Sequence, residues 1–202
     1  MERKKILDVL ETKPYLKKDL FIRGFLITDN EPVNLNDFPF YSNWNIEYHN
    51  GFYFMAHFLT GMHIYEENGN TFFIMGHAYN PFTMECDEIN ILKKIAEFYG
   101  TDEYMEQIND LTGVFVYGDI IDGKLSYLVD PSGMQSACSG IVKETFYLSS
   151  HPQLIGDICD LTMDSLVEEL VNYKWYGRVM GPYLPGDLTP FKEIKRIVPS
   201  II

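Results

Sequence analysis

Apolar residues recur at helical spacing in three segments of the chain, and four helices are expected in all. The N-terminal segment predicts a short amphipathic helix that Pro14 ends. A central helix is stopped by Gly100, and a shorter helix over 103–111 follows it. Further on, Thr162 can cap a fourth helix that carries one apolar stripe. The apolar positions behind the first, second and fourth helices are Ile6, Leu7, Leu10, Ile89, Leu92, Ile95, Ala96, Tyr99, Met163, Leu166, Val167, Leu170 and Val171.

Other segments have the apolar, aromatic and β-branched composition of strands. The first is Leu20 to Thr28, which reads LFIRGFLIT, and the aromatic run Phe52 to Leu59 is another. Between them, residues 29–45 are rich in Pro, Asn and Asp and predict a loop. Two shorter strands are expected at 145–149 and 194–198.

Two dipeptides, Asn68-Gly69 and Asp122-Gly123, predict tight β-hairpins because both turn residues must adopt positive φ. The arms of the second hairpin are long and apolar, so we expect it in the middle of a sheet. Strands outnumber helices and pair largely as antiparallel hairpins. The sequence therefore predicts an α+β protein, not a doubly wound parallel sheet.

The composition narrows the possible partners. The chain has 202 residues, enough for one large core or at most two small domains, and a formal net charge of −13. A surface with this much negative charge repels phosphate backbones and anionic lipids. Neither nucleic acid nor a membrane is therefore expected as a partner. The N-terminal segment is no signal peptide, and no apolar run is long enough to span a bilayer. A cytoplasmic protein is expected.

Three cysteines, Cys86, Cys138 and Cys159, lie far apart in the sequence without the spacing of a disulfide framework or a zinc site. Free thiols in a reducing cytosol are the favoured interpretation. Cys86 precedes Asp87 and Glu88, which allows a displaced nucleophile or a metal ligand. Acids at the N-terminus of a helix, where they face the positive end of the dipole, explain the same residues more simply.

Histidines offer two further sites. His57, His63 and His77 lie on or beside neighbouring predicted strands and could converge on a metal, but no two have close ligand spacing. Structural histidines are favoured and no metal site is expected. Ser149-Ser150-His151 invites comparison with a Ser–His catalytic pair. Adjacent side chains of a strand point to opposite faces, which argues against this pair.

Four stretches in order resemble the glutaminase (class II glutamine amidotransferase) domain of asparagine synthases. MGHAYN at 75–80 is similar to the family's NGEIYN, which ends a hairpin strand. INDLTGVFVYGDI at 108–120 resembles its helix-to-strand passage LNGMFAFAIWD, and VDPSGM at 129–134 its turn RDRLGI. LPGDLTPFKEIKRIVP at 184–199 resembles its exit segment. The resemblance implies a four-layer αββα sandwich of two antiparallel sheets, Ntn-hydrolase-like, over residues 20–202, after a helical extension over 1–19.

The family's nucleophile is a cysteine at the first position of the mature chain, whose own α-amine acts as the base. This cysteine opens the first strand in a C-G-I-x-G-I sequence. Here the matching strand is LFIRGFLI, in which Gly24 stands for the second glycine and Leu20 for the cysteine. Leu20 has no nucleophile, and its nitrogen is an amide because nineteen residues precede it. Loss of such a nucleophile costs about a millionfold in turnover.

The resemblance maps the rest of a vestigial glutamine pocket. Met75 replaces the oxyanion-hole asparagine, so only the backbone N–H of Gly76 is left there. The substrate-holding acid maps near Asp87 or Glu88, and the arginine that grips the substrate carboxylate is missing near His57. The residues of this vestigial pocket are Leu20, His57, Met75, Gly76, Asn80, Asp87 and Glu88.

The resemblance therefore implies a non-catalytic glutaminase-like domain that needs no cofactor. It would serve as a scaffold or binding module for an ATP-dependent amide-forming synthetase domain, in cis or in trans. That domain's S-G-G-x-D-S pyrophosphate loop is not in this chain. A homodimer is an open alternative. Two other functions stay open: an active amidotransferase that supplies ammonia for amide synthesis, and a sensor of small molecules or peptides that uses the vestigial pocket.

Overall fold

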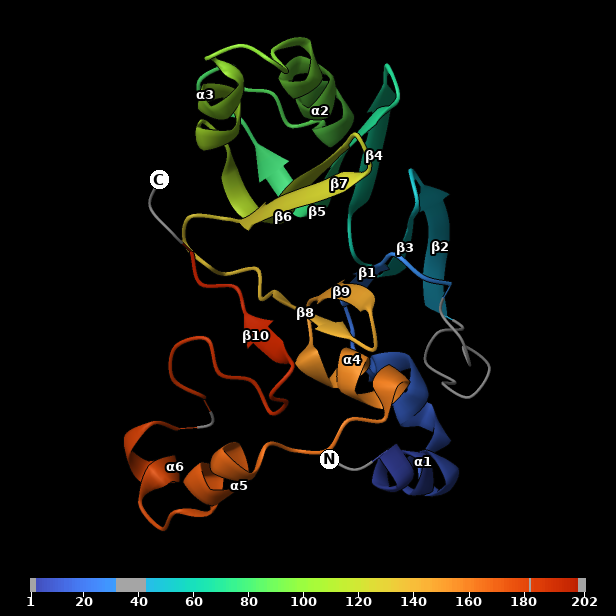
Figure 1. The fold of residues 1–202 in the computed structure, drawn as a ribbon, viewed down its shortest axis with the longest axis vertical. Coiled ribbons are helices and arrows are strands. Elements are labelled where there is room, and N and C mark those ends of the chain that lie inside the picture. The colour runs from blue at the N-terminus through green and yellow to red at the C-terminus, as the bar shows by residue number, and fades with distance from the viewer. Residues whose placement is uncertain (1–2, 32–42, 182, 200–202) are drawn as a thin grey trace. The chain divides into compact units, whose positions relative to one another are not determined.

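The structure is a computed structural model that describes residues 3–31, 43–181 and 183–199. Among these residues, strands form two antiparallel sheets, one with the order β10-β8-β9-β1-β3-β2 and one with the order β4-β5-β6-β7 (Figure 1). The predicted α+β class is confirmed. The chain divides into two compact units. Of the described residues, the second unit contains Tyr48–Gly51, Thr60–Ser136 and Pro199, and the first unit contains the rest.

The N-terminal helix is confirmed as α1 (Arg3–Thr12), and a short 3-10 helix, η1 (Pro14–Asp19), follows it. The predicted strand over 20–28 is wrong in its first half, because β1 covers only Phe25–Thr28. Phe21 and Arg23 have φ angles of 49° and 57°, in the left-handed region that a strand cannot include. The chain therefore turns between η1 and β1.

In the six-stranded sheet, β1 lies between β3 (Phe52–His57) and β9 (Thr145–Ser149). The helix α4 (Pro152–Cys159) packs on the buried core of this sheet through Leu154 and Ile155. The remaining strands are β2 (Trp44–His49), β8 (Cys138–Val142) and β10 (Ile194–Arg196). The predicted loop 29–45 falls in part on residues 32–42, which lie outside the described residues.

The second unit contains the two predicted hairpins. The first joins β4 (Met62–Glu67) to β5 (Asn70–Tyr79), and the second joins β6 (Thr112–Ile121) to β7 (Lys124–Val129). Both central residues of each turn have positive φ, as an Asn-Gly or Asp-Gly turn requires. The placement of the second hairpin is only half right, because β6 is central and β7 is an edge strand.

Two helices cover one face of the four-stranded sheet (Figure 1). They are α2 (Glu88–Glu97) and α3 (Tyr104–Asn109), both close to their predicted positions. Leu92 and Ile95 of α2 are buried against Phe72 and Ile74 of β5. This packing places the N-terminus of α2 in the second unit together with β4 and β5.

The C-terminal part of the first unit has two more helices, α5 (Ser165–Asn172) and α6 (Tyr176–Val179). The N-cap of α5 is Asp164 and not the predicted Thr162, because an Asp164 carboxylate oxygen accepts the N–H of Leu166 at 2.7 Å. No helix in the described part of the chain is both long enough and apolar enough to cross a membrane.

A buried chain of hydroxyl groups crosses from α3 to β6. Tyr117 Oη lies 2.8 Å from Tyr104 Oη, which donates to Asp119 Oδ2 at 2.6 Å. Burial raises the pKa of Asp119 above its ordinary value of 3.8, and the donors Tyr104 and Ser126 offset part of this rise. The native state therefore keeps a proton on Asp119 at pH values where the unfolded chain has released it.

We expect Asp119→Asn to remove a pH dependence of stability. Because the native protein binds the extra proton, its free energy of unfolding falls as pH rises from about 3.8 through the raised pKa of Asp119, by at most about 1.4 kcal/mol per pH unit. In urea denaturation between pH 4.5 and 7.5, the free energy of unfolding of the variant should rise relative to that of the wild type as pH rises. Asp102 is exposed, so in the control variant Asp102→Asn this difference from the wild type should not change with pH. A difference between wild type and Asp119→Asn that is constant over this range would contradict the prediction.

Candidate functional site

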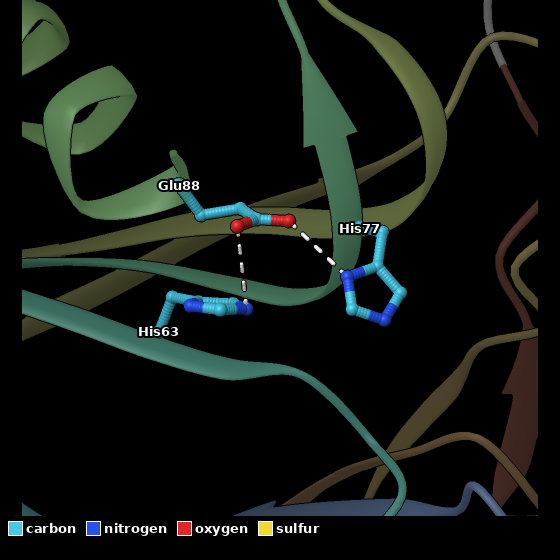
Figure 2. Close-up of side chains that lie close together, drawn as sticks. All are labelled: His63, His77 and Glu88. Atoms are coloured by element: carbon cyan, nitrogen blue, oxygen red, sulfur yellow. Dashed lines mark hydrogen bonds and ion pairs between the residues drawn. The ribbon is translucent and has the colours of Figure 1, made fainter. Parts of the chain in front are cut away.

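Three side chains from three elements of the second unit meet at one end of β5 (Figure 2). They are His63 of β4, His77 of β5 and Glu88, the first residue of α2. His77 Nδ1 lies 3.2 Å from Glu88 Oε1, and His63 Nε2 lies 3.7 Å from Glu88 Oε2. Each carboxylate oxygen therefore faces a different imidazole. We call these three residues the His–Glu cluster.

The strand pairing brings the two histidines together. The register between β4 and β5 pairs His63 with Ile74, and Gly76 N donates to Gly61 O at 2.8 Å just before β4 begins. A Cβ atom on Gly61 would lie 2.7 Å from His63 Nε2 and 3.2 Å from His77 Cε1. Glycine at position 61 therefore leaves the space that both rings occupy.

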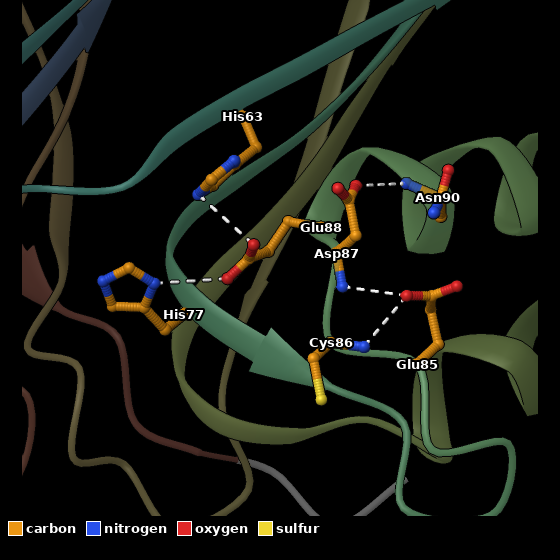
Figure 3. A network of polar contacts seen from close by, with 7 residues as sticks. All are labelled: His63, His77, Glu85, Cys86, Asp87, Glu88 and Asn90. Atoms are coloured by element: carbon orange, nitrogen blue, oxygen red, sulfur yellow. Dashed lines mark hydrogen bonds and ion pairs between the residues drawn. The ribbon is translucent and has the colours of Figure 1, made fainter.

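The N-terminus of α2 holds the glutamate in place. Glu85 Oε1 accepts the N–H groups of Cys86 and Asp87 at 3.0 and 2.9 Å, and Asp87 caps the helix by accepting the N–H of Asn90 at 3.0 Å (Figure 3). The helix N-terminus predicted for Cys86-Asp87-Glu88 is confirmed. The thiol of Cys86 points away from the two histidines (Figure 3).

The cluster is open on one side. The side chain of Glu88 is 13% exposed, that of His63 25% and that of His77 74%. His63 Nε2 is itself buried and has no hydrogen-bond partner among the described residues. A buried polar nitrogen in this state is uncommon, because most such atoms find a partner. The arrangement can accept a proton, a metal ion or a donor group from a ligand between the three side chains.

The seven residues that the resemblance assigns to a vestigial pocket are divided between the two units. Leu20 and His57 belong to the first unit, and the other five belong to the second. Leu20 directly follows η1 and packs on the core of the six-stranded sheet. His57 is buried at the end of β3, where its Nδ1 accepts the N–H of Leu59 at 3.1 Å. Burial lowers the pKa of His57, which therefore favours the neutral ring.

Of the five residues in the second unit that the resemblance assigns to the pocket, Glu88 alone belongs to the His–Glu cluster. Met75 is fully buried in β5, and the N–H of Gly76 is bonded to Gly61 O. Asn80 is buried after β5, and its Oδ1 accepts the N–H groups of Phe82 and Thr83 at 2.9 and 3.1 Å. These groups organise the strand and the turn that follows it.

The remaining cysteines and the Ser–His segment lie in the first unit. Burial raises the pKa of Cys138 to about 12 and also raises the pKa of Cys159, so neither thiol forms a thiolate readily. The expectation that Ser150 and His151 point apart is wrong, because Ser150 Oγ lies 2.8 Å from His151 Nδ1. His151 lies beyond the end of β9, where strand alternation no longer applies. Ser150 Oγ also accepts the N–H of Phe25 at 2.8 Å.

Sequence reasoning named His63, His77 and Glu88 separately but did not join them. It grouped His63 and His77 with His57, which lies in the first unit. One signal in the sequence could have joined Glu88 to the two histidines: Glu88 lies at the start of a predicted helix that follows the hairpin. A cavity of about 380 Å³ lies nearby in the same unit, between α2, α3 and the turn after Asn80.

Comparison of the sequence with protein-family models finds no matching family, and comparison with curated proteins finds none that is similar.

Proposed function

We propose that this chain is a non-catalytic glutaminase-like module of the asparagine synthase type, with an Ntn-hydrolase-like fold. Three of the family-like stretches lie on the kinds of element that the resemblance implies. MGHAYN ends β5, a hairpin strand, and INDLTGVFVYGDI runs from α3 into β6. VDPSGM follows β7 as a turn in which Gly133 N donates to Asp130 O at 2.9 Å. These placements support the family assignment.

The start of β1 is the observation that carries the proposal. A glutaminase of this family needs a thiol and a free amine on the residue that opens the first strand. The residue that opens β1 is Phe25, whose side chain is apolar and fully buried. Its nitrogen is a peptide N–H that donates to Ser150 Oγ at 2.8 Å. Whether Leu20 or Phe25 is matched to the cysteine, the position has neither nucleophile nor base.

The anion-binding part of the pocket supports the same interpretation. An oxyanion hole needs N–H donors that point at the developing charge and have no other acceptor. Gly76, the one donor that the resemblance leaves in place, gives its N–H to Gly61 O. Met75 offers no side-chain donor. Stabilisation of a tetrahedral intermediate at this position therefore has no donor left to supply it.

As a module without this chemistry, the chain would support an ATP-dependent amide-forming domain, in cis or in trans, that uses free ammonia or an amine. We expect the 202-residue chain to release ammonia from glutamine no faster than buffer does. A coupled ammonia assay with 10 mM-scale glutamine, on the order of ten times a high KM, checks this. The Cys86→Ser variant is the control, because Cys86 is the exposed thiol among the three.

Glutamine hydrolysis that disappears in Cys86→Ser would overturn the proposal and identify a displaced nucleophile. Glutamine hydrolysis that persists in Cys86→Ser would also overturn the proposal, because a group other than the exposed thiol would then be the nucleophile.

The cavity between α2 and α3 favours a second function, the binding of a small polar molecule. Its volume of about 380 Å³ lies within the range of ligand sites, and its lining includes Asn80, Lys93, Glu97 and Gln107. Calorimetric titration with glutamine and short peptides separates the two functions. Saturable binding of either ligand without ammonia release, weakened by Gln107→Ala, would favour the sensor.

A further inference from the structure

Two contacts of the His–Glu cluster, each to a different oxygen of Glu88, are close to the separation that a metal ion imposes on its ligands. Two ligand atoms at about 2.1 Å from a tetrahedral ion lie roughly 3.4 Å apart. The two contacts to Glu88, 3.2 and 3.7 Å, lie on either side of this value. One ligand atom from each of the three residues lies within 4.8 Å of the other two. The ring of His77 is largely exposed, so its rotation can close the remaining separation.

The buried nitrogen of His63 points to a missing ligand. His63 Nε2 has no hydrogen-bond partner among the described residues and lies too far from Glu88 Oε2 for a hydrogen bond. An ion between His63, His77 and Glu88 would give this nitrogen a partner. It would also replace two weak histidine–carboxylate contacts with three coordination bonds.

We propose that His63, His77 and Glu88 bind a divalent transition metal of the zinc class. Two imidazoles and one carboxylate suit Zn²⁺ and its first-row neighbours, whereas Mg²⁺ and Ca²⁺ prefer oxygen ligands alone. Three protein ligands leave one coordination position for water or an anionic ligand. Glu85 and Asp87 add negative charge beside the site and hold the backbone that positions Glu88 (Figure 3).

Titration of the full chain with Zn²⁺ alone, followed by calorimetry or by competition with a chromophoric chelator, tests the proposal. We expect one Zn²⁺ per chain with a Kd on the order of 1 µM or tighter, and no comparable binding of Mg²⁺. His77→Ala and Glu88→Gln should each weaken binding by about a hundredfold or more. At a hundredfold excess over Kd, Zn²⁺ should raise the Tm of the wild type by roughly 5–10 °C.

Two control variants give the test its specificity. His49→Ala breaks a second histidine–glutamate pair of the same unit, in which His49 Nδ1 lies 2.9 Å from Glu66 Oε1. Cys86→Ser removes the exposed thiol beside the cluster. Neither should change Zn²⁺ affinity. Because His77 is exposed, His77→Ala should keep the Tm of the metal-free protein, so a loss of binding there is not a loss of fold.

Three results would overturn the metal site. The first is the absence of saturable binding up to 1 mM Zn²⁺, a concentration about a thousandfold above the expected Kd. The second is wild-type Zn²⁺ affinity in His77→Ala. The third is a loss of Zn²⁺ binding in Cys86→Ser. None of them bears on the ammonia assay, so the two proposals stand or fall separately.

Discussion

Replacing Asp130 with alanine is expected to lower the free energy of unfolding by about 3 kcal/mol or more. The Asp130 side chain has no solvent exposure and accepts four hydrogen bonds. They come from the N–H groups of Ser132, Met134 and Gln135, at 3.1, 3.2 and 2.8 Å, and from the hydroxyl of Ser132. Residues 131–134 of the turn are themselves exposed, so alanine costs chiefly the hydrogen bonds that these donors make to the buried carboxylate, each worth about 1.5–3 kcal/mol. Chemical denaturation measures the loss.

Two neighbouring variants calibrate this effect. Asp130→Asn keeps one acceptor oxygen and should lose less than alanine does. Ser132→Ala removes one donor and leaves the carboxylate with three partners, so it should cost about 1 kcal/mol. Equal losses for Asp130→Ala and Ser132→Ala would show that the carboxylate does not organise the turn.

The second large effect is expected at Gly113, where alanine should destabilise the protein by about 2–4 kcal/mol. Gly113 pairs with Ala78 across β5 and β6 and has a φ of 138°, which L-residues rarely adopt. A Cβ there would lie 2.2 Å from His77 O and 3.1 Å from Ala78 Cα. These atoms belong to the backbone of a hydrogen-bonded strand, so they cannot move away without breaking the β5–β6 pairing.

Gly123→Ala separates conformational strain from steric clash. Gly123 also has a positive φ, 72°, but no atom would lie within 4 Å of its Cβ. We therefore expect about 1 kcal/mol from strain alone at this position. Thermal or urea unfolding of both variants checks the difference. If Gly113→Ala is no more destabilising than Gly123→Ala, the close approach of β5 and β6 is not what requires glycine at position 113.

Both hairpin turns, α2 and α3 could be predicted from the sequence because their signals are local. Asn68-Gly69 and Asp122-Gly123 specify their turns through the φ angles of two residues, and α2 follows from apolar spacing within ten residues. The strand β2 was not predicted although WNIEYH alternates apolar and polar residues, because the loop expected over 29–45 overlaps its first two residues; the strand is largely exposed, so burial does not follow the alternation. The strand β8 is short and has a glycine at its centre.

The start of β1 shows the limit of composition as a guide. LFIRGFLIT is apolar enough for one long strand, but positive φ angles at Phe21 and Arg23 divide it into a turn and a four-residue strand. The donors and acceptors that settle this lie far away in sequence. Ser150 Oγ accepts the N–H of Phe25, and the end of β9 pairs with β1.

The sequence by itself determined the α+β class, the hairpins, and the helix N-terminus at Asp87, because each depends on residues close together in the chain. Only the tertiary structure decided that His63, His77 and Glu88 meet and that His57 belongs to the other unit. It also decided that the N–H of Gly76 is bonded to Gly61 O. The physical reason is that these contacts depend on the register of β4 on β5 and on the packing of α2 over the sheet. Both are set by a buried core spread over many segments, and no single segment of the sequence encodes them.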